Sequence, residues 1–227
     1  MKRFCIPPQN SAAFVACMED VLAVYHLPYN PDRPVVCFDE TSKQLVEHVR
    51  QPLPAGPGAR LKIDDEYKRC GTANIFLAVE PLTGEVILGP TYQRTARDCA
   101  EFLKYIADEV HARASIIVLV CDNLNTHTLA CLYEAFPPQE ARRLAERFEI
   151  HHTPKHGSWL NVAECELSVV SRACLNQRIG SIEVLSRILR AWIDSRRVKA
   201  VNWQFTAEQA RVKLHRLYPI TSVETEH

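Results

Sequence analysis

The sequence lacks the features that mark secreted, membrane-spanning or disulfide-rich proteins. No apolar run approaches the length of a membrane span, and prolines interrupt the N-terminal stretch MKRFCIPPQN where a signal peptide needs an apolar segment. The 9 cysteines include no Cys-x-x-Cys pair, and most lie inside apolar runs, as reduced core cysteines do. We therefore predict a cytoplasmic protein that does not associate with a membrane.

Net charge, internal repeats and low-complexity segments are also lacking. The 27 Lys and Arg residues balance 27 Asp and Glu residues, so overall charge favours neither nucleic acid nor a membrane as a partner. Residues 165–220, however, hold ten basic and four acidic side chains. This local excess indicates either an anionic partner or a solvated helical face whose arginines cover apolar surface.

The length of 227 residues and the 47% hydrophobic content allow one domain with a sizeable core. We predict a helical segment or linker at residues 1–33, the main domain at residues 34–218 and a tail at residues 219–227. Short apolar runs bounded by turn residues predict strands, and apolar residues at helical spacing predict helices. The predicted strands are residues 34–40, 73–80, 85–92, 115–123 and 148–153.

The predicted helices are residues 11–27, 94–113, 126–136, 138–147, 159–175, 181–196 and 207–217. Residues 52–60, PLPAGPGAR, predict a loop because they contain three prolines and two glycines. This order of elements predicts an α/β fold, in which helices flank both faces of a mixed five-stranded sheet.

Two aspartates, Asp39 and Asp122, end strands that can lie side by side in such a sheet. Each alone is typical of a turn or cap residue. Two neighbouring carboxylates raise each other's pKa unless a cation lies between them, and Mg²⁺ is the cation that prefers carboxylate oxygens while keeping positions for phosphate and water. The pair therefore indicates a metal site for phosphoryl transfer, which a third acid from a helix would complete.

The third acid is expected at the start of the helix within HHTPKHGSWLNVAECELS, residues 151–168, where Glu164 and Glu166 are the candidates. Helical periodicity places Glu166 inside the apolar arc and Glu164 at its edge, which favours Glu166 slightly. Glu164 also fits a purely structural pattern, because Asn161 is a candidate N-cap with a glutamate three residues later. The residues alone leave the choice open.

The histidines of the same stretch, His151, His152 and His156, lack the spacing of a zinc site. His156 and the neighbouring Lys155 precede a helix N-terminus, which favours a phosphate contact instead.

Three blocks of the sequence, VVCFDE, VLVCDNLNTH and HHTPKHGSWLNVAECELSVVSR, resemble the catalytic blocks of DDE transposases of the mariner-like superfamily, especially the bacterial insertion-sequence 630 family. The resemblance covers residues 34–217 and implies a ribonuclease H-like fold. It implies that Asp39, Asp122 and Glu164 are the catalytic acids and metal ligands, for Mg²⁺ with Mn²⁺ as a substitute. The choice of Glu164 over Glu166 rests on the Asn-x-x-Glu pattern of the family.

The same resemblance implies supporting roles for Glu40, Asn123, His127 and Asn161. The reaction it implies is hydrolysis of a DNA phosphodiester bond at transposon ends, followed by strand transfer into target DNA. The expected partners are DNA and a second copy of the chain, as a homodimer on DNA. The residues expected to contact DNA are Lys155, His156, Arg172 and Arg178.

The chain departs from the family in two respects. Members of the family usually carry N-terminal helix-turn-helix domains, whereas only about 33 residues precede the first predicted strand here. We therefore expect this chain to be a catalytic domain, as a second reading frame, a truncated copy or a fragment. Between Asp122 and Glu164 lie 41 residues, more than in the mariner type, and the predicted helix at residues 138–147 accounts for the excess. Two alternatives follow: a catalytically idle regulator that binds DNA or a transposase, and a ribonuclease H-like nuclease that acts on RNA.

Overall fold

The computed structural model describes residues 11–122 and 128–219, and its centre is a five-stranded sheet. The strands are β1 Val35–His48, β2 Tyr67–Glu80, β3 Glu85–Thr91, β4 Ile117–Cys121 and β5 Phe148–His152. Their order is β3-β2-β1-β4-β5, with antiparallel pairing from β3 to β1 and parallel pairing from β1 to β5. The predicted mixed five-stranded sheet is therefore confirmed.

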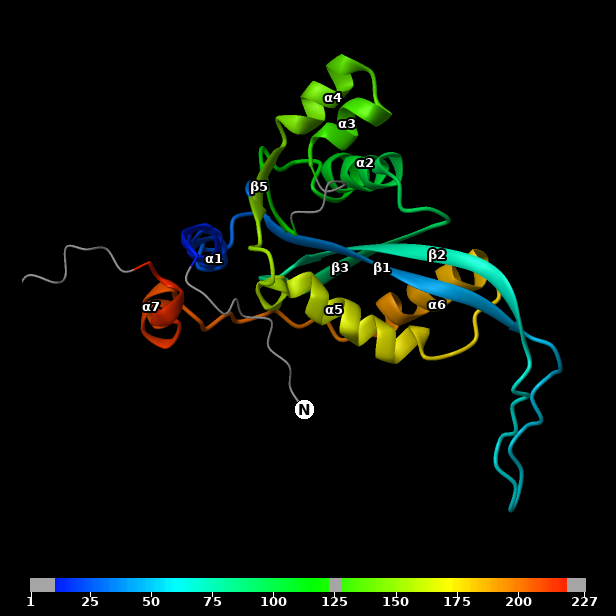
Figure 1. Ribbon diagram of the computed structural model, residues 1–227. Helices are drawn as coiled ribbons and strands as arrows, with labels where there is room; N and C mark the ends of the chain where they lie inside the picture. The colour runs from blue at the N-terminus through cyan, green and yellow to red at the C-terminus, as the bar shows by residue number, and fades with distance from the viewer. Residues whose placement is uncertain (1–10, 123–127, 220–227) are drawn as a thin grey trace, which may run out of the picture.

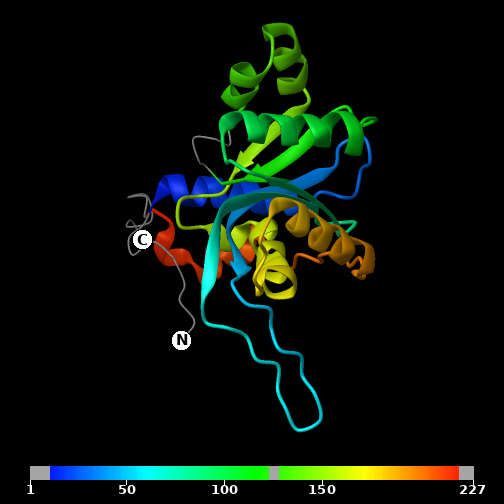
Figure 2. The same cartoon turned by 90° about the vertical axis from the view of Figure 1, so that its right-hand side faces the viewer.

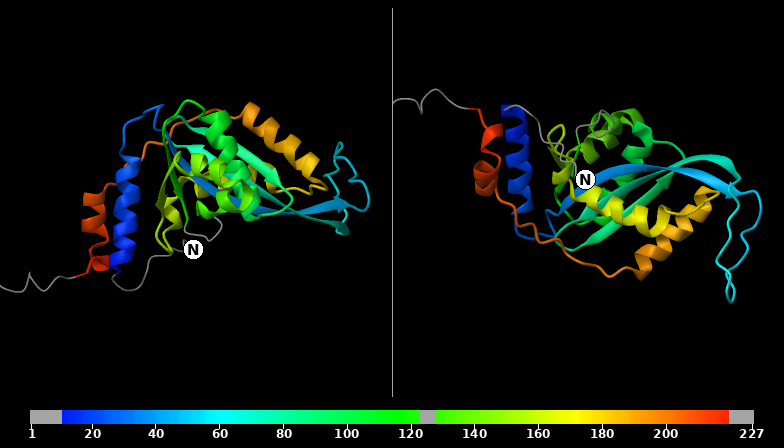
Figure 3. Two further views of the ribbon diagram at one scale, coloured as in Figure 1. Left: turned by 90° about the horizontal axis from the view of Figure 1, so that it is seen from above. Right: turned by 60° about the horizontal axis from the view of Figure 1, so that its bottom comes forward.

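Helices cover both faces of the sheet (Figure 1). They are α1 Ala12–Tyr25, α2 Ala96–Tyr105, α3 Ala130–Ala135, α4 Pro138–Ala145, α5 Val162–Val170, α6 Ile182–Ser195 and α7 Ala207–Lys213. Helices α2, α3 and α4 lie on one face, α5 and α6 on the other, and α7 lies beside α1, as Figures 1 and 3 show. Within the described residues, no helix has the length and apolar character needed to cross a bilayer.

The strand alternation of β1 builds two hydrophobic cores, one on each face of the sheet. Val35 and Cys37 point into the core formed with α1, α5 and α6, whereas Val36 and Phe38 point into the core formed with α2, α3 and α4. Helix α1 belongs to the first core, since its Met18 side chain is fully buried. The N-terminal helix is thus packed into the same body as the sheet.

Several elements differ in length from the predictions. Strand β1 continues past residue 40 to His48 because antiparallel pairing with β2 holds its polar half, in which Leu45 is the buried apolar side chain. The apolar run in the sequence therefore predicted only the buried half of β1. The helix predicted from residue 159 begins at Val162, after the 3₁₀ turn Ser158–Leu160.

Residues 49–66 form an arm that projects from the ends of β1 and β2, well away from the sheet (Figure 2). It contains the predicted loop at residues 52–60. Two backbone bridges, Leu53 with Lys62 and Gly56 with Ala59, pair its two sides.

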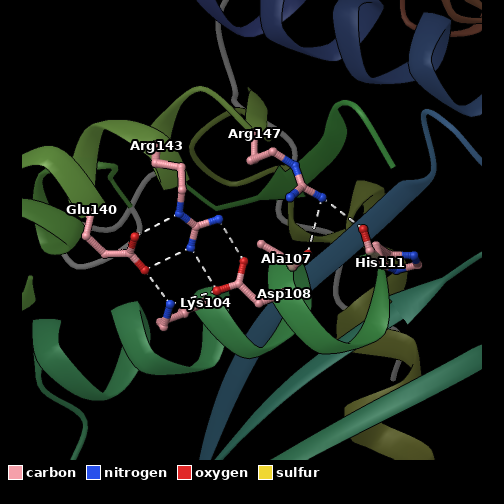
Figure 4. Close-up of polar contacts among 7 residues, drawn as sticks. All are labelled: Lys104, Ala107, Asp108, His111, Glu140, Arg143 and Arg147. Carbon is pink, nitrogen blue, oxygen red and sulfur yellow. Dashed lines mark hydrogen bonds and ion pairs between the residues drawn. The ribbon is translucent and has the colours of Figure 1, made fainter. Parts of the chain in front are cut away.

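Helix α4, the additional helix between the second and third acids, is fastened to α2 and to the π-helical turn that continues it (Figure 4). Arg143 donates hydrogen bonds to the carboxylates of Asp108 and Glu140, and Lys104 contacts the same two carboxylates. Arg143 and Lys104 hold the pKa of Asp108 and that of Glu140 at about 2, so both acids are ionised at neutral pH. Arg147 adds hydrogen bonds to two backbone carbonyls at the end of that turn.

Helix α2 packs closely on the sheet through Phe102, whose ring lies 5.9 Å from that of Phe38 and 5.7 Å from that of Phe76. The strand residue beneath this ring is Gly89. A Cβ atom at Gly89 would lie 2.6 Å from Cδ2 of Phe102, so the close approach requires a residue without a side chain.

We expect Gly89→Ala to lower the free energy of unfolding by about 1–3 kcal/mol, because the added methyl group overpacks the aromatic stack. Gly56→Ala in the arm is the matched control, since a Cβ there meets nothing within 4 Å. Urea denaturation of both variants measures the effect. Equal stability of the two variants would contradict the close packing of α2 on β3.

Candidate active site

The parallel pairing of β1 with β4 brings Asp39 and Asp122 together. The paired residues include Cys37 with Val120, and each aspartate follows its strand residue by two positions. Since side chains alternate along a strand, Asp39 lies on the face that α5 covers, and Asp122 directly follows the end of β4. The strands of the two aspartates are therefore neighbours, as the sequence predicted, although Asp39 lies within β1 and Asp122 follows the end of β4.

Asn161 joins the start of α5 to the end of the buried part of β1. Its side chain is almost completely buried and its Nδ2 donates to the Phe38 carbonyl at 3.1 Å and to Asp39 Oδ2 at 3.4 Å. Its Oδ1 accepts from the Ala163 N–H, so Asn161 is the N-cap of α5. One amide side chain therefore orients both the catalytic-candidate carboxylate and the helix.

Tyr25 of α1 also bonds to the backbone on either side of Asn161. Its hydroxyl donates to the Leu160 carbonyl at 2.6 Å and accepts from the Val162 N–H at 3.4 Å. These bonds fix the backbone on both sides of Asn161. The sequence analysis did not find this role, because Tyr25 lies 135 residues from Leu160 in the chain.

Glu164 extends from the first turn of α5 toward Asp39. Both residues line an open groove of about 520 Å³, together with Glu40 and Arg172. The Glu164 carboxylate accepts a hydrogen bond from the Ser158 side chain, while the Asn161 N–H donates to the Ser158 carbonyl. Asn161 and Glu164 therefore do not form the reciprocal capping box that their spacing suggested.

Glu166 points elsewhere and has a different partner. Its Oε2 lies 3.2 Å from Nη2 of Arg196, and both side chains are largely buried. The Arg196 guanidinium also lies 4.7 Å from the ring of Trp192. A buried cation thus explains why a glutamate lies within the apolar arc of α5, and the structure brings Glu164 rather than Glu166 to the groove.

The three acids affect one another electrostatically. Burial raises the pKa of Asp39 to about 7, and the carboxylates of Glu164 and Asp122 add to the shift. Burial also raises the pKa of Glu164, with a further contribution from Asp122. These shifts mean that ionising Asp39 and Glu164 together is unfavourable without a compensating cation.

The donor set of the groove matches a hard divalent cation. Carboxylate oxygens are the ligands that Mg²⁺ and Mn²⁺ prefer, and Asp39 and Glu164 bring such oxygens to the groove. Among the described residues, however, no three His, Cys, Asp or Glu side chains already converge in a geometry that could hold a metal. The groove therefore has the chemistry of a metal site without a closed ligand cluster.

The remaining predicted residues lie in several places. Glu40 borders the groove and forms an ion pair with Arg94, whose Nη1 lies 3.1 Å from Glu40 Oε1. Lys155 and His156 are exposed in the turn between β5 and α5, where His156 has φ 67°, in the left-handed region. Asn123 and His127 lie outside the described residues.

Arg178 does not lie in the groove. Its Nη1 donates to the Glu66 carbonyl at 2.8 Å and contacts His48 Nδ1 at 3.2 Å, and the guanidinium lies 5.7 Å from the Tyr67 ring. Arg178 thus fastens the base of the arm, so its donors are engaged by the chain itself rather than directed at a ligand in the groove.

Strands in this order, with acids at one end of the sheet and on a following helix, define a ribonuclease H-like fold. The family model described as DDE superfamily endonuclease matches residues 34–186. This chain belongs to that family. No curated protein matches the chain.

Solved structures of the Mos1 mariner transposase share the fold. A paired-end complex with Mn aligns with a TM-score of 0.53 at 16% identity, covering 96% of this chain and 62% of that one. The strand transfer complex aligns with a TM-score of 0.58 at 14% identity and the same coverages. A pre-cleavage transpososome gives 0.55 at 16% identity, covering 96% and 63%. This chain thus spans less than two thirds of the length of these relatives.

The two glutamates of α5 predict opposite phenotypes. We expect Glu164→Gln to fold with equal or greater stability, because it removes a negative charge from the groove, but to lose affinity for Mg²⁺. We expect Glu166→Gln to lower the free energy of unfolding by about 3 kcal/mol, because it leaves the buried Arg196 charge uncompensated. Urea denaturation and calorimetric titration with Mg²⁺ or Mn²⁺ measure both effects. Retained metal binding in Glu164→Gln together with its loss in Glu166→Gln would transfer the role to Glu166.

Proposed function

We propose that this chain is the catalytic domain of a transposase of the insertion-sequence 630 type, which hydrolyses a DNA phosphodiester bond at transposon ends and carries out strand transfer. The observation that carries the proposal is that Asp39 and Glu164 line one groove, while β4, which ends just before Asp122, pairs with the strand that carries Asp39. Family membership supports the endonuclease chemistry, and the fold shared with the Mos1 complexes supports the assignment to transposition.

In this proposal Asp39, Asp122 and Glu164 hold two Mg²⁺ ions, or Mn²⁺ as a substitute. When bound, such ions activate an attacking oxygen and stabilise the leaving oxygen. Asn161 keeps the Asp39 carboxylate oriented through its hydrogen bond, and the N-cap that it forms sets the first turn of α5 so that Glu164 faces the same groove. Glu40 supports Asp39 through its backbone N–H, which donates to Asp39 Oδ1 at 2.8 Å.

DNA is the substrate in this proposal, and the groove is where the scissile phosphate lies. Arg172 lines the groove on η4, the helical turn Ser171–Leu175 that continues α5, and supplies a cation for the phosphate backbone. Lys155 and His156 are exposed next to the start of α5 and extend this contact. The related Mos1 structures include a paired-end complex with the left transposon end, which supports DNA ends as the ligand.

We expect Asp122→Asn and Asp39→Asn to lower metal-dependent cleavage by roughly 10³-fold or more, since each removes a ligand of ions that supply several kcal/mol of transition-state stabilisation. The substrate is a duplex that carries the inverted repeats flanking the gene, incubated with Mg²⁺ or Mn²⁺. Glu146→Gln is the matched control, because Glu146 forms an exposed ion pair with Arg142 on α4.

The same assay separates the alternatives. Cleavage of RNA or of an RNA–DNA hybrid in preference to the duplex would support a nuclease of another specificity. Binding of the duplex by the wild-type protein without cleavage in either metal would support a catalytically idle regulator. Full activity of Asp122→Asn would disprove the assignment of the acids.

We also propose that the chain acts as a homodimer on DNA. The support comes from the arm, residues 49–66, which projects into solvent with four exposed apolar side chains. These are Val49, Leu53, Leu61 and Ile63, each more than half exposed. Apolar side chains gathered on a projecting segment favour a surface that another protein covers, and a second copy brought to the paired DNA ends is that partner.

We expect the double variant Leu53→Ser with Ile63→Ser to remain monomeric on end DNA where the wild-type protein forms dimers. The reason is the loss of apolar area from the arm without any change in the core. Val212→Ser on α7 is the control, since Val212 is also an exposed apolar side chain. Light scattering with and without the duplex measures the oligomeric state. A dimer that survives the arm substitutions would contradict this role of the arm.

A further inference from the structure

Arg94 lies between β3 and α2 and reaches Glu40, which follows Asp39 within β1. Its Nη1 lies 3.1 Å from Glu40 Oε1, and the Glu40 side chain is 2% exposed whereas that of Arg94 is 52% exposed. Glu40 directly follows Asp39 in the strand and donates its backbone N–H to the Asp39 carboxylate. The guanidinium is thus anchored one residue from a proposed metal ligand while half of its side chain faces solvent.

The backbone that carries Arg94 is held by the adjoining helix cap. Thr95 and Asp98 form a capping box, in which the Asp98 carboxylate accepts from the Thr95 N–H at 2.8 Å and the Thr95 hydroxyl accepts from the Asp98 N–H at 3.2 Å. Asp98 therefore occupies the helix N-terminus itself. The Asp98 carboxylate thus already places a negative charge at the start of α2.

A cation directly before a helix N-terminus is electrostatically unfavourable, since the N-terminal end of the helix dipole is positive. The Glu40 carboxylate offsets that cost for Arg94 and also orients it. A guanidinium has five N–H donors, and the contact with Glu40 engages one of its edges. The exposed part of Arg94 therefore retains donors for a second acceptor, in the fork geometry that suits phosphate.

The charges around the groove indicate which kind of acceptor the exposed donors of Arg94 would bind. Asp39, Glu40 and Glu164 line the groove and repel a nucleic-acid backbone, whereas Arg172 is the basic residue of its lining. Arg94 lies on the other side of Glu40, toward α2 and β3. The Glu40 side chain, like that of Phe38, is on the α2 side of the sheet, so Arg94 lies on that side and Arg172 on the α5 side. The two arginines thus lie on opposite sides of the strand that carries Asp39.

We propose that Arg94 binds a backbone phosphate of the DNA strand that enters the catalytic groove, with Glu40 as the residue that orients its guanidinium. This inference rests on the proposed function, because it takes DNA as the substrate of the groove. Arg94 and Arg172 thus contact the DNA backbone on opposite sides of the strand that carries Asp39.

The test compares Arg94→Gln, Arg94→Lys and Arg142→Gln. Arg142 forms an exposed ion pair with Glu146 on α4, so its substitution removes an arginine–glutamate pair of the same kind away from the groove. Binding of the end duplex is measured in an Asp122→Asn background across a series of salt concentrations, and cleavage kinetics are measured in the active background. Thermal unfolding of each variant reports on stability.

We expect Arg94→Gln to weaken DNA binding several-fold and to reduce the slope of log K against log salt by about 1, as the loss of one phosphate contact does. Arg94→Lys is expected to restore the salt slope but only part of the affinity, since an ammonium lacks the fork. KM for the duplex should rise more than kcat falls. Arg142→Gln should match the wild-type protein in all of these measurements.

An unchanged salt slope in Arg94→Gln would overturn the proposal, as would a fall in stability that accounts for the lost activity, because either result would make the pair with Glu40 purely structural. The outcome is separable from that of the proposed function. If the wild-type protein bound the duplex but did not cleave it, the catalytic assignment would fail while the salt slopes still decided the role of Arg94. A wild-type protein that bound no DNA would overturn both.

Discussion

The parallel pairing of β1 with β4 is the constraint on which the rest of the site depends. The register that pairs Cys37 with Val120 places Asp39 on the face that α5 covers and Asp122 directly after the end of β4, the neighbouring strand. A shift of one residue would turn one carboxylate toward the opposite core, which is lined by Phe38 and the α2 face. Both strands are apolar on both faces here, so the register comes from the backbone pairing of the sheet, and that pairing sets where the two aspartates lie.

The position of Glu164, the third acid, depends instead on hydrogen bonds that tie the start of α5 to β1 and to α1. Asn161 links the start of α5 to β1, and Tyr25 links it to α1. Both groups are buried, and buried polar groups that are fully bonded fix a single geometry more sharply than apolar packing does. Helix α1 is therefore part of what positions the catalytic candidate Glu164, although it precedes the sheet in the chain.

The sequence predicted the mixed five-stranded sheet and that the strands of Asp39 and Asp122 can lie side by side, because these follow from local apolar runs and turn residues. It placed Asp39 at the end of its strand, whereas β1 continues to His48. It predicted only the buried half of β1, because residues 41–48 are held by pairing with β2 and not by burial. Helical periodicity could not separate Glu164 from Glu166, since it shows which face of the helix a residue lies on and not which side chain it pairs with. That partner, Arg196, lies 30 positions away from Glu166. Arg94 was also missed, although an arginine directly before a helix cap is a signal, because the dipole disfavours it.

The acidic residues near the groove fall into two groups according to whether their hydrogen-bond partners are neutral or charged. Among the described residues, the hydrogen bonds to Asp39 come from the Asn161 amide and the Glu40 N–H, and that to Glu164 comes from the Ser158 side chain. All are neutral donors, which orient a carboxylate without cancelling its charge.

Glu166 and Glu40, by contrast, each face an arginine. An arginine between Asp39 and Glu164 would satisfy both acids and compete with a metal for their oxygens. The chain instead places Arg172 in the groove lining and Arg94 against Glu40, away from Asp39 and Glu164. In the proposed function this leaves the charge of the two acids available to a divalent ion, while the arginines meet the phosphates of DNA.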